Sequence, residues 1–200
     1  MKLRHFTLPL VAAVALSLAA CSKEDTTGAP GTAGASAADK APIAAAQAYD
    51  VLSAQGKGFT AGALMSANTV FVLFDPQCPH CGHLWQAAEP LLGKARFVWL
   101  PVAFIGPKSL PQGAALLQAA QPQETMNAHE RSLLAGEGGI GASSSIPDDI
   151  EAAIKTNTEL LNRLGAESVP FIVAQSASGQ PVLQAGSMDT AALAALLGLP

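Results

Sequence analysis

A continuous apolar run followed at once by a Cys-x-x-Cys motif constrains this chain most. Residues 69–74 read TVFVLF, the length and composition expected of a strand that is buried on both faces. The residues Asp-Pro-Gln end the run, and residues 78–81 read CPHC. Pro79 fits the first turn of a helix, and apolar residues then recur at helical spacing. The sequence therefore predicts a buried strand, a tight loop and a helix that begins at Cys78 and is kinked or ends near Pro90.

The other patterns along the chain predict an α/β domain. They are, in chain order, a short helix at 41–53, a strand at 96–105, three helical stretches between 110 and 164 with a Gly/Ser-rich loop at 136–145, strands at 171–174 and 181–185, and a helix at 188–197. This order of strands and helices is typical of a sheet flanked by helices. With 200 residues, half of them hydrophobic, we expect one well-buried domain. The net charge of -4 and the lack of a basic block exclude nucleic acid as an expected partner.

The first forty residues have the composition of an export signal followed by a tether. Basic residues, a short apolar run and small residues precede Cys21, and the run is too short for a good membrane-spanning helix. Residues 18–21 (LAAC) resemble the lipobox of bacterial lipoproteins, in which the cysteine carries the lipid. We expect a lipoprotein signal peptide at 1–20, lipid attachment at Cys21 and a flexible tether at 21–40, with an ordinary cleaved signal or an uncleaved anchor as alternatives. Ser22 favours the outer membrane, because an inner-membrane retention signal usually has Asp there.

Three chemistries use Cys-x-x-Cys, and the neighbouring residues separate them. Haem attachment needs His directly after the second cysteine, where this chain has Gly82. Zinc needs about four ligands, and the sequence offers no second cysteine pair, only histidines at 80, 83 and 129. We therefore expect no metal site and interpret Cys78 and Cys81 as a redox pair.

The predicted helix start gives the two cysteines different roles. Free backbone N–H groups and the helix dipole favour the thiolate at Cys78, so Cys78 is expected to attack a substrate disulfide. Cys81, one turn into the helix, is expected to be more buried and less acidic. It would then resolve the mixed disulfide and release the substrate.

The segment FDPQCPHC at 74–81 resembles the thioredoxin fold, and within it the periplasmic disulfide interchange proteins of the DsbC/DsbG type, in particular the DsbG catalytic domain. The similarity continues through residues 157–170 (NTELLNRLGAESVP) to the last helix, over roughly residues 69–198. The resemblance implies a central mixed sheet flanked by helices, with a helical insertion at about 110–164 in a domain at 69–200. It also implies that Val169-Pro170 is a cis-proline pair that offers backbone to an incoming peptide in the substrate groove.

The resemblance further implies the partners and cofactors. Cysteine-containing exported proteins would be the substrates, a membrane redox partner would reset the pair, and no cofactor beyond the Cys78–Cys81 disulfide would be needed. The DsbC/DsbG proteins have an N-terminal dimerisation domain. Here residues 41–68, interpreted as an N-terminal helical segment, leave no room for one, so we expect a monomer.

The redox loop departs from the DsbG type. Pro79-His80 and Val169 match the oxidase DsbA, whereas the DsbG type has Tyr and Thr at the positions of His80 and Val169. His80 can stabilise the Cys78 thiolate by a hydrogen bond or by its charge, although a solvent-exposed loop histidine is the alternative. Pro79 and His80 are thus expected to modulate the pair. The loop favours an oxidase, and the overall resemblance favours an isomerase or a reductase.

Four other side chains near these motifs have simpler interpretations. Asp75 is expected to cap the turn rather than to move a proton to Cys81, and Trp85 to lie in the core. His83 and His129 are expected at the surface. We interpret the chain as a periplasmic, lipid-anchored thiol:disulfide oxidoreductase or isomerase; a lipoprotein that handles Zn²⁺ or Cu⁺ and a chaperone-like binding module are the alternatives.

Overall fold

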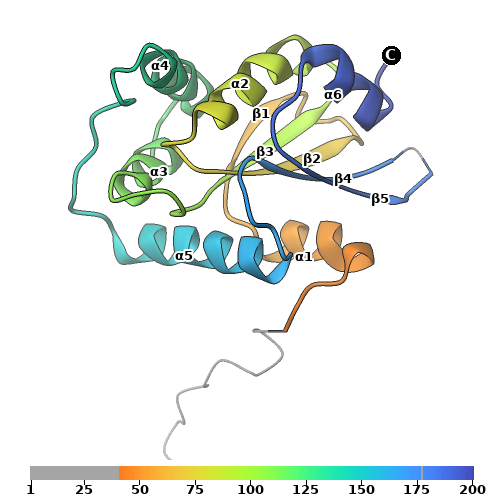
Figure 1. The fold of residues 1–200 in the computed structure, drawn as a ribbon, viewed down its shortest axis with the longest axis horizontal. Helices are drawn as coiled ribbons and strands as arrows, with labels where there is room; N and C mark the ends of the chain where they lie inside the picture. The colour runs from red at the N-terminus through yellow and green to blue at the C-terminus, as the bar shows by residue number, and fades with distance from the viewer. Residues whose placement is uncertain (1–40, 177) are drawn as a thin grey trace, which may run out of the picture. The chain divides into compact units, whose positions relative to one another are not determined.

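The computed structural model describes residues 41–176 and 178–200. The predicted signal peptide, Cys21 and the tether lie outside these residues. The described elements are, in chain order, η2 (Ala45–Gln47), α1 (Ala48–Gln55), β1 (Phe59–Gly62), β2 (Thr69–Phe74), α2 (Pro79–Ala88), η3 (Glu89–Leu91), β3 (Arg96–Pro101), α3 (Ser109–Leu117), α4 (Pro122–Leu134), α5 (Asp148–Arg163), β4 (Phe171–Gln175), β5 (Pro181–Ala185) and α6 (Thr190–Leu197). Figure 1 shows their arrangement. Within the described parts of the chain, no helix is both long and apolar enough to cross a membrane.

Five strands form one mixed sheet in the order β1-β3-β2-β4-β5. The central strand β2 runs parallel to β3 and antiparallel to β4, while β1 and β5 add antiparallel strands at the two edges. All six residues of β2 are buried, whereas β5 is largely exposed. The central position explains why β2 is a continuous apolar run instead of an alternating one.

Helices cover both faces of the sheet, as the sequence predicts. In Figure 1, α1 and α5 lie on one face, and α2 and α6 lie on the other. The segment between β3 and β4 contributes α3, α4 and α5, which form the predicted helical insertion. Within it, α4 packs against α2 and α3 packs against α5, so the insertion reaches both faces of the sheet.

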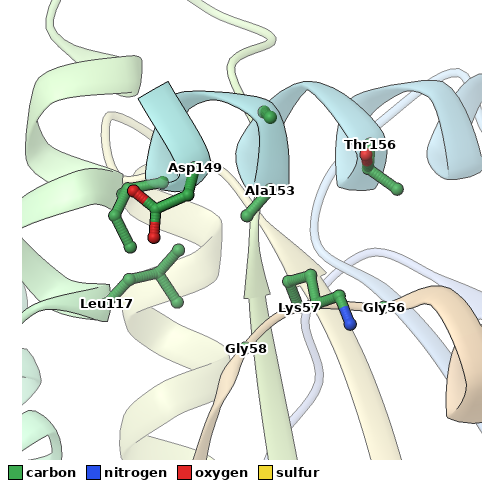
Figure 2. A pocket seen from close by; sticks show the side chains of 9 residues that line it. Gly56, Lys57, Gly58, Leu117, Asp149, Ala153 and Thr156 are labelled. Carbon is green, nitrogen blue, oxygen red and sulfur yellow. The ribbon is translucent and has the colours of Figure 1, made fainter. Parts of the chain in front are cut away.

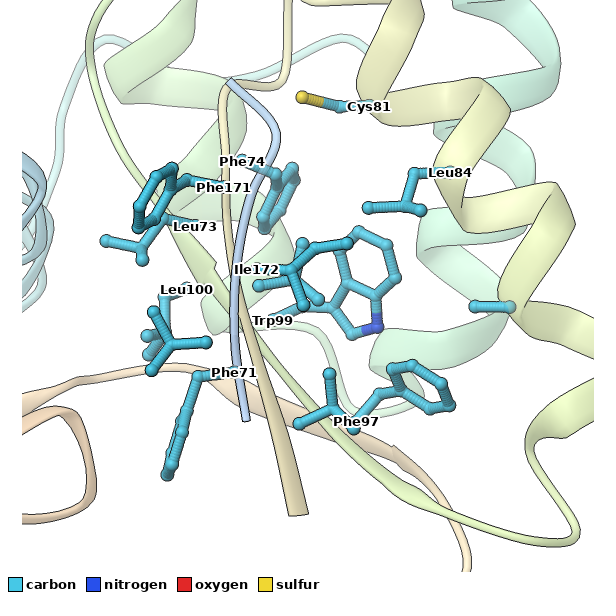
Figure 3. Close-up of a cluster of buried hydrophobic side chains, with 14 of the residues drawn as sticks. Phe71, Leu73, Phe74, Cys81, Leu84, Phe97, Trp99, Leu100, Phe171 and Ile172 are labelled. Carbon is cyan, nitrogen blue, oxygen red and sulfur yellow. The ribbon is translucent and has the colours of Figure 1, made fainter. Parts of the chain in front are cut away.

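Core residues lie on both faces of the sheet, and the aromatic part between the sheet and α2 meets the redox motif at one end. The rings of Trp85 and Trp99 contact edge to face with centroids 4.9 Å apart, and Phe74 meets Trp99 in the same way at 5.6 Å. Figure 3 shows the Cys81 side chain at the end of this cluster, next to Phe74 and Leu84. Trp85 is 2% exposed and its indole N–H donates to the Asn127 side chain over 2.7 Å, so the predicted core position is confirmed.

Two expected element boundaries differ from the structure. The segment 41–68, interpreted as helical, also contains strand β1, which pairs with β3. Its four residues, Phe59–Gly62, are too few to show a strand period. Gly58 before it is needed because a Cβ there would lie 2.3 Å from the Trp99 carbonyl oxygen.

The second difference is the strand expected at 96–105, which ends at Pro101. The amides of Phe104 and Ile105 donate to the Asp75 carboxylate over 2.7 and 2.8 Å instead of continuing the sheet. A side chain from the neighbouring loop thus ends β3 before its apolar sequence does.

Candidate active site

The two cysteines lie at the start of α2, directly after the loop that connects it to β2. Residues Asp75, Pro76 and Gln77 carry the chain from the end of β2 to Cys78, which is the N-cap of α2 with an extended backbone (φ -98°, ψ 109°). Pro79 occupies the first turn, and the Cys81 amide donates to the Cys78 carbonyl over 2.9 Å. Both cysteines are free thiols in this structure, with Cys78 4% and Cys81 0% exposed.

The surroundings move the two thiol pKa values in opposite directions. The pKa of Cys78 is lowered from 9.0 to about 6, mainly by a hydrogen bond from the Cys81 thiol; burial opposes this, and the backbone N–H groups of Cys81 and His80 and then the His80 charge assist it. The pKa of Cys81 is raised well above 9.0, first by burial and then by its hydrogen bond to Cys78. Near neutral pH this arrangement holds Cys78 as a thiolate and Cys81 as a thiol.

The residues that the resemblance assigned to a groove lie beside Cys78. The Val169–Pro170 peptide bond is cis, as the resemblance predicts. The Cys78 sulfur lies 3.5 Å from the Val169 carbonyl oxygen, across a sequence separation of 91 residues, and donates to it when it is protonated. The structure therefore brings Cys78, Cys81 and the Val169-Pro170 backbone together at one point.

His80 has a smaller electrostatic effect than the sequence suggested. Its side chain is exposed, 6.4 Å between ring centroids from the equally exposed His83. Its charge is the last of the causes that lower the pKa of Cys78, after the Cys81 thiol and the backbone N–H groups. The backbone at the helix start therefore does more for the thiolate than the imidazole does.

Asp75 is a buried carboxylate that fixes the loop before Cys78. It accepts hydrogen bonds from the Gln77 amide and the Ser109 hydroxyl at one oxygen, both over 2.7 Å, and from the amides of Phe104 and Ile105 at the other. Four donors satisfy an ionised carboxylate, which supports the predicted turn role over proton transfer. The same contacts tie the loop after β3 and the start of α3 to the redox loop.

The expectation that His129 lies at the surface is wrong. His129 is fully buried on α4, where its Nε2–H donates to the Pro76 carbonyl over 2.7 Å and its Nδ1 accepts from the Ile140 amide over 3.2 Å. Burial lowers the pKa of His129, in keeping with this neutral tautomer. Gly139, at φ +82°, leaves the space that the imidazole occupies, because a Cβ there would lie 2.5 Å from the ring.

Further contacts between the insertion and the redox loop also escaped sequence reasoning. The Gln77 side chain donates to the Gln112 side chain and to the Gly138 carbonyl, and Gln112 donates to the carbonyls of Gly138 and Ile140 over 2.9 and 2.8 Å. For α4, the sequence did contain a signal that one helix face is buried: Met126, His129 and Glu130 are spaced i, i+3 and i+4 and so lie on the same face. All three are buried against α2 and its loop.

A second concave site lies away from the cysteines. Figure 2 shows a pocket of about 650 Å³ between α5, the end of α3 and the connection from α1 to β1. It is lined by residues such as Lys57, Leu117 and Asp149 and includes neither Cys78 nor Cys81. Among residues 41–176 and 178–200, no three His, Cys, Asp or Glu side chains gather as metal ligands.

Comparisons with known proteins agree with this geometry. No protein-family model matches the chain. The thiol:disulfide interchange protein DsbG of Pseudomonas aeruginosa is 30% identical over 131 residues, which is 64% of this chain and 50% of that protein; its Escherichia coli counterpart is 29% identical over the same length, 64% of this chain and 52% of that protein. The chain thus spans about half the length of these curated relatives.

The likeness extends to solved structures. A periplasmic thioredoxin-like protein from Salmonella enterica serovar Typhimurium superposes with a TM-score of 0.61 at 16% identity, over 76% of this chain and 94% of that one. At this identity the match concerns the fold alone, and it confirms the predicted thioredoxin fold. The chain is therefore a thioredoxin-fold protein related in sequence to the DsbG thiol:disulfide interchange proteins.

Proposed function

We propose that the protein exchanges disulfides with cysteine-containing exported proteins through Cys78 and Cys81. The observation that carries the proposal is the placement of Cys78 at the N-cap of α2 beside the Val169 carbonyl, with Cys81 buried one turn further on. This placement lowers the pKa of Cys78 to about 6 and raises that of Cys81. Only a thiolate attacks a disulfide, and a neighbouring thiol can then release the product without a second protein. The sequence relation to two interchange proteins supports the same chemistry.

The exchange follows from the positions of the sulfurs. The Cys78 thiolate attacks one sulfur of a substrate disulfide, and the other substrate sulfur leaves with the electron pair. Cys81 then attacks Cys78, the mixed disulfide breaks, and the second substrate sulfur leaves as a thiol while Cys78 and Cys81 become a disulfide. In the reverse direction a substrate thiolate attacks Cys78 of the disulfide, and Cys81 leaves with the electron pair. A second substrate thiolate then attacks the substrate sulfur of the mixed disulfide, so that the substrate leaves with a disulfide and Cys78 leaves as the thiolate. No cofactor beyond this disulfide enters either direction.

We assign substrate binding and modulation of the redox pair to the residues around Cys78. The backbone of Val169-Pro170 pairs with an extended substrate segment that carries the reacting cysteine, a role supported by the 3.5 Å distance between the Val169 carbonyl oxygen and the Cys78 sulfur. Pro79 fixes the start of α2 and His80 adds a donor and a charge at the rim. Reductase and oxidase activity use these steps in opposite directions, according to which redox form the membrane partner maintains. In isomerase activity another substrate thiol, instead of Cys81, resolves the mixed disulfide at Cys78.

We place the protein in the periplasm as a lipid-anchored monomer attached through Cys21, with the outer membrane favoured. The lipobox-like LAAC and the residues before it support the anchor, and the interchange relatives support the compartment. A Cys21→Ser variant should move from the membrane fraction to the soluble fraction and lose incorporation of labelled fatty acid. A wild-type protein that incorporates no fatty acid would remove the anchor and leave the exchange chemistry untouched.

Trapping experiments test the exchange chemistry. Cys81→Ala should accumulate mixed disulfides with exported proteins, visible as bands that disappear on reduction, because the resolving thiol is gone. Cys78→Ala should form none and should lose turnover of a scrambled or reduced model substrate. Retained turnover in Cys78→Ala would overturn the proposal, and stoichiometric Zn²⁺ or Cu⁺ in the purified protein, with no redox transition, would favour the metal-handling alternative.

A further inference from the structure

One buried carboxyl group near the cysteines has no partner in the structure. Glu130 on α4 is 2% exposed, and neither of its carboxyl oxygens makes a hydrogen bond. A buried polar group without a partner is costly, and a buried charge without one costs still more. Asp75, the other buried carboxylate by the redox loop, is satisfied by four donors, so Glu130 has no comparable structural reason to be there.

The Glu130 carboxyl lies against α2 at the residue that follows Cys81. Its Oε2 is 2.6 Å from the position that a Cβ on Gly82 would occupy, and the Leu134 side chain also lies next to that position. Any side chain at position 82 would push the carboxyl away. Gly82 therefore lets a carboxyl from the insertion reach the backbone of α2 beside the resolving thiol.

The charged groups around Glu130 link it to the two thiols. Burial, then the negative charges at Cys78 and Asp75, raise the pKa of Glu130 to about 9. In turn Glu130 contributes to the raised pKa of Cys81. The other ionisable residues of α2, His80 and His83, are exposed, and α3 and β1, which also pack on α4, carry none.

Glu130 also has a route to solvent. It lines a pocket of about 160 Å³ together with Trp85, Asn127, Glu89 and Arg131. Glu89 and Arg131 are exposed at the rim. A proton held at Glu130 can therefore exchange with water through this pocket without crossing the core.

We propose that Glu130 holds the proton that Cys81 gives up and takes back during disulfide exchange, and that Gly82 admits it to this place. The proposal rests on the exchange function proposed above and assigns a further residue to it. When Cys81 attacks the mixed disulfide at Cys78, its S–H bond breaks, the Glu130 carboxylate takes the proton, a new S–S bond forms, and the substrate thiolate leaves. When a substrate thiolate attacks the Cys78–Cys81 disulfide, Cys81 leaves with the electron pair and takes the proton from the Glu130 carboxyl.

The charge on Cys78 determines at which step Glu130 holds a proton and at which step it can accept one. A thiolate at Cys78 favours the protonated carboxyl, so the reduced protein stores the proton. In the mixed disulfide Cys78 carries no charge, which removes one of the causes that hold the proton on Glu130. The carboxyl can then release its stored proton to water and, as the carboxylate, act as the base at the step that needs one.

Rapid mixing of the reduced protein with dithiobis(nitrobenzoate) separates the two thiols. The first coloured nitrothiobenzoate is released when Cys78 attacks, and the second when Cys81 resolves the mixed disulfide. Glu130→Gln should leave the first phase unchanged and slow the second on the order of 10²-fold near neutral pH, the usual contribution of a positioned base. The pH profile of the second phase should change shape, because the variant depends on spontaneous ionisation of Cys81.

Two further variants separate proton transfer from packing. Gly82→Ala keeps the carboxyl but displaces it, and it should slow the second phase with the fold intact, since the clash is with the end of a flexible side chain. Glu124→Gln removes an exposed carboxylate from the same helix and should behave as wild type. A second phase that is unchanged in Glu130→Gln, or slowed equally at every pH, would overturn the role of Glu130 while the first phase still supports exchange at Cys78. A wild-type protein without a first phase would overturn both.

Discussion

Replacing Cys81 by Ala or by Ser should separate the two sources of the Cys78 thiolate. The hydrogen bond from the Cys81 thiol is the largest cause of the lowered pKa of Cys78, ahead of the backbone N–H groups. Ala removes the donor and Ser replaces it with a hydroxyl of similar size. The pKa of Cys78 should therefore rise in Cys81→Ala and stay low in Cys81→Ser.

The magnitude follows from the energies of the contacts. The shift from 9.0 to about 6 corresponds to at most about 4 kcal/mol in favour of the thiolate. A hydrogen bond to a charged group contributes about 1.5 to 3 kcal/mol, which is about one to two pKa units. We expect the pKa of Cys78 to be about 7 to 8 in Cys81→Ala and within about one unit of 6 in Cys81→Ser.

Alkylation of Cys78 by iodoacetamide measures this pKa directly. Both variants have a single cysteine in the described domain, so the rate of mass gain against pH reports the thiolate fraction of Cys78 alone. Circular dichroism should show the same fold for both proteins. Equal pKa values for the Ala and Ser variants, both near 6, would mean that the helix start alone holds the thiolate and that the Cys81 hydrogen bond does not.

Three other substitutions test the surroundings of the site. Glu130→Gln should become more stable relative to wild type as pH rises. The pKa of Glu130 is about 9 in the folded protein and 4.5 in the unfolded chain, so the wild-type free energy of unfolding falls by up to about 1.4 kcal/mol per pH unit between these values. Urea unfolding of the reduced proteins near pH 4.5 and pH 9 measures this; an equal stability difference at both pH values would mean that the Glu130 pKa is not raised. His129→Ala should lower the free energy of unfolding by about 2 to 4 kcal/mol, because the Pro76 carbonyl and the Ile140 amide lose their partner; a loss within about 0.5 kcal/mol would contradict its role as an anchor. His80→Tyr should raise the pKa of Cys78 by less than Cys81→Ala does, since the His80 charge is the smallest cause and its backbone N–H remains; a larger rise, seen in the same alkylation profile, would restore the imidazole as the main influence.

The central part of the fold could be predicted because its sequence pattern is local. The run TVFVLF is central strand β2, and CPHC opens α2 with Cys78 as its N-cap. Pattern and position agree here because a strand buried on both faces needs apolar residues throughout. The cis bond before Pro170 came from the family resemblance and not from composition, since a strand-start proline is usually trans.

The missed features depend on contacts between distant segments. Strand β1 forms because it pairs with the edge of β3. Strand β3 ends early because the amides of Phe104 and Ile105 donate to the Asp75 carboxylate instead of to a neighbouring strand. His129 was expected at the surface, yet its hydrogen bond to the Pro76 carbonyl holds it inside. Glu130, which the sequence did not single out, is buried in the space that Gly82 leaves open. Tertiary packing overrides the single-residue preference at these positions, all of which lie around the redox loop.

The equilibrium reduction potential of the Cys78–Cys81 pair tests the proposed exchange site most directly. It can be measured in glutathione buffers through the fluorescence of Trp85, whose ring lies one turn after Cys81 on α2. Each unit by which the thiolate pKa falls corresponds to about 30 mV, and a thiol with pKa about 7 accompanies a potential of about -270 mV in thioredoxin. A Cys78 pKa of about 6 therefore predicts about -240 mV or somewhat higher, between the reductants and the strong oxidants. The absence of a redox transition, or a potential clearly below about -270 mV, would contradict a thiolate-based exchange site.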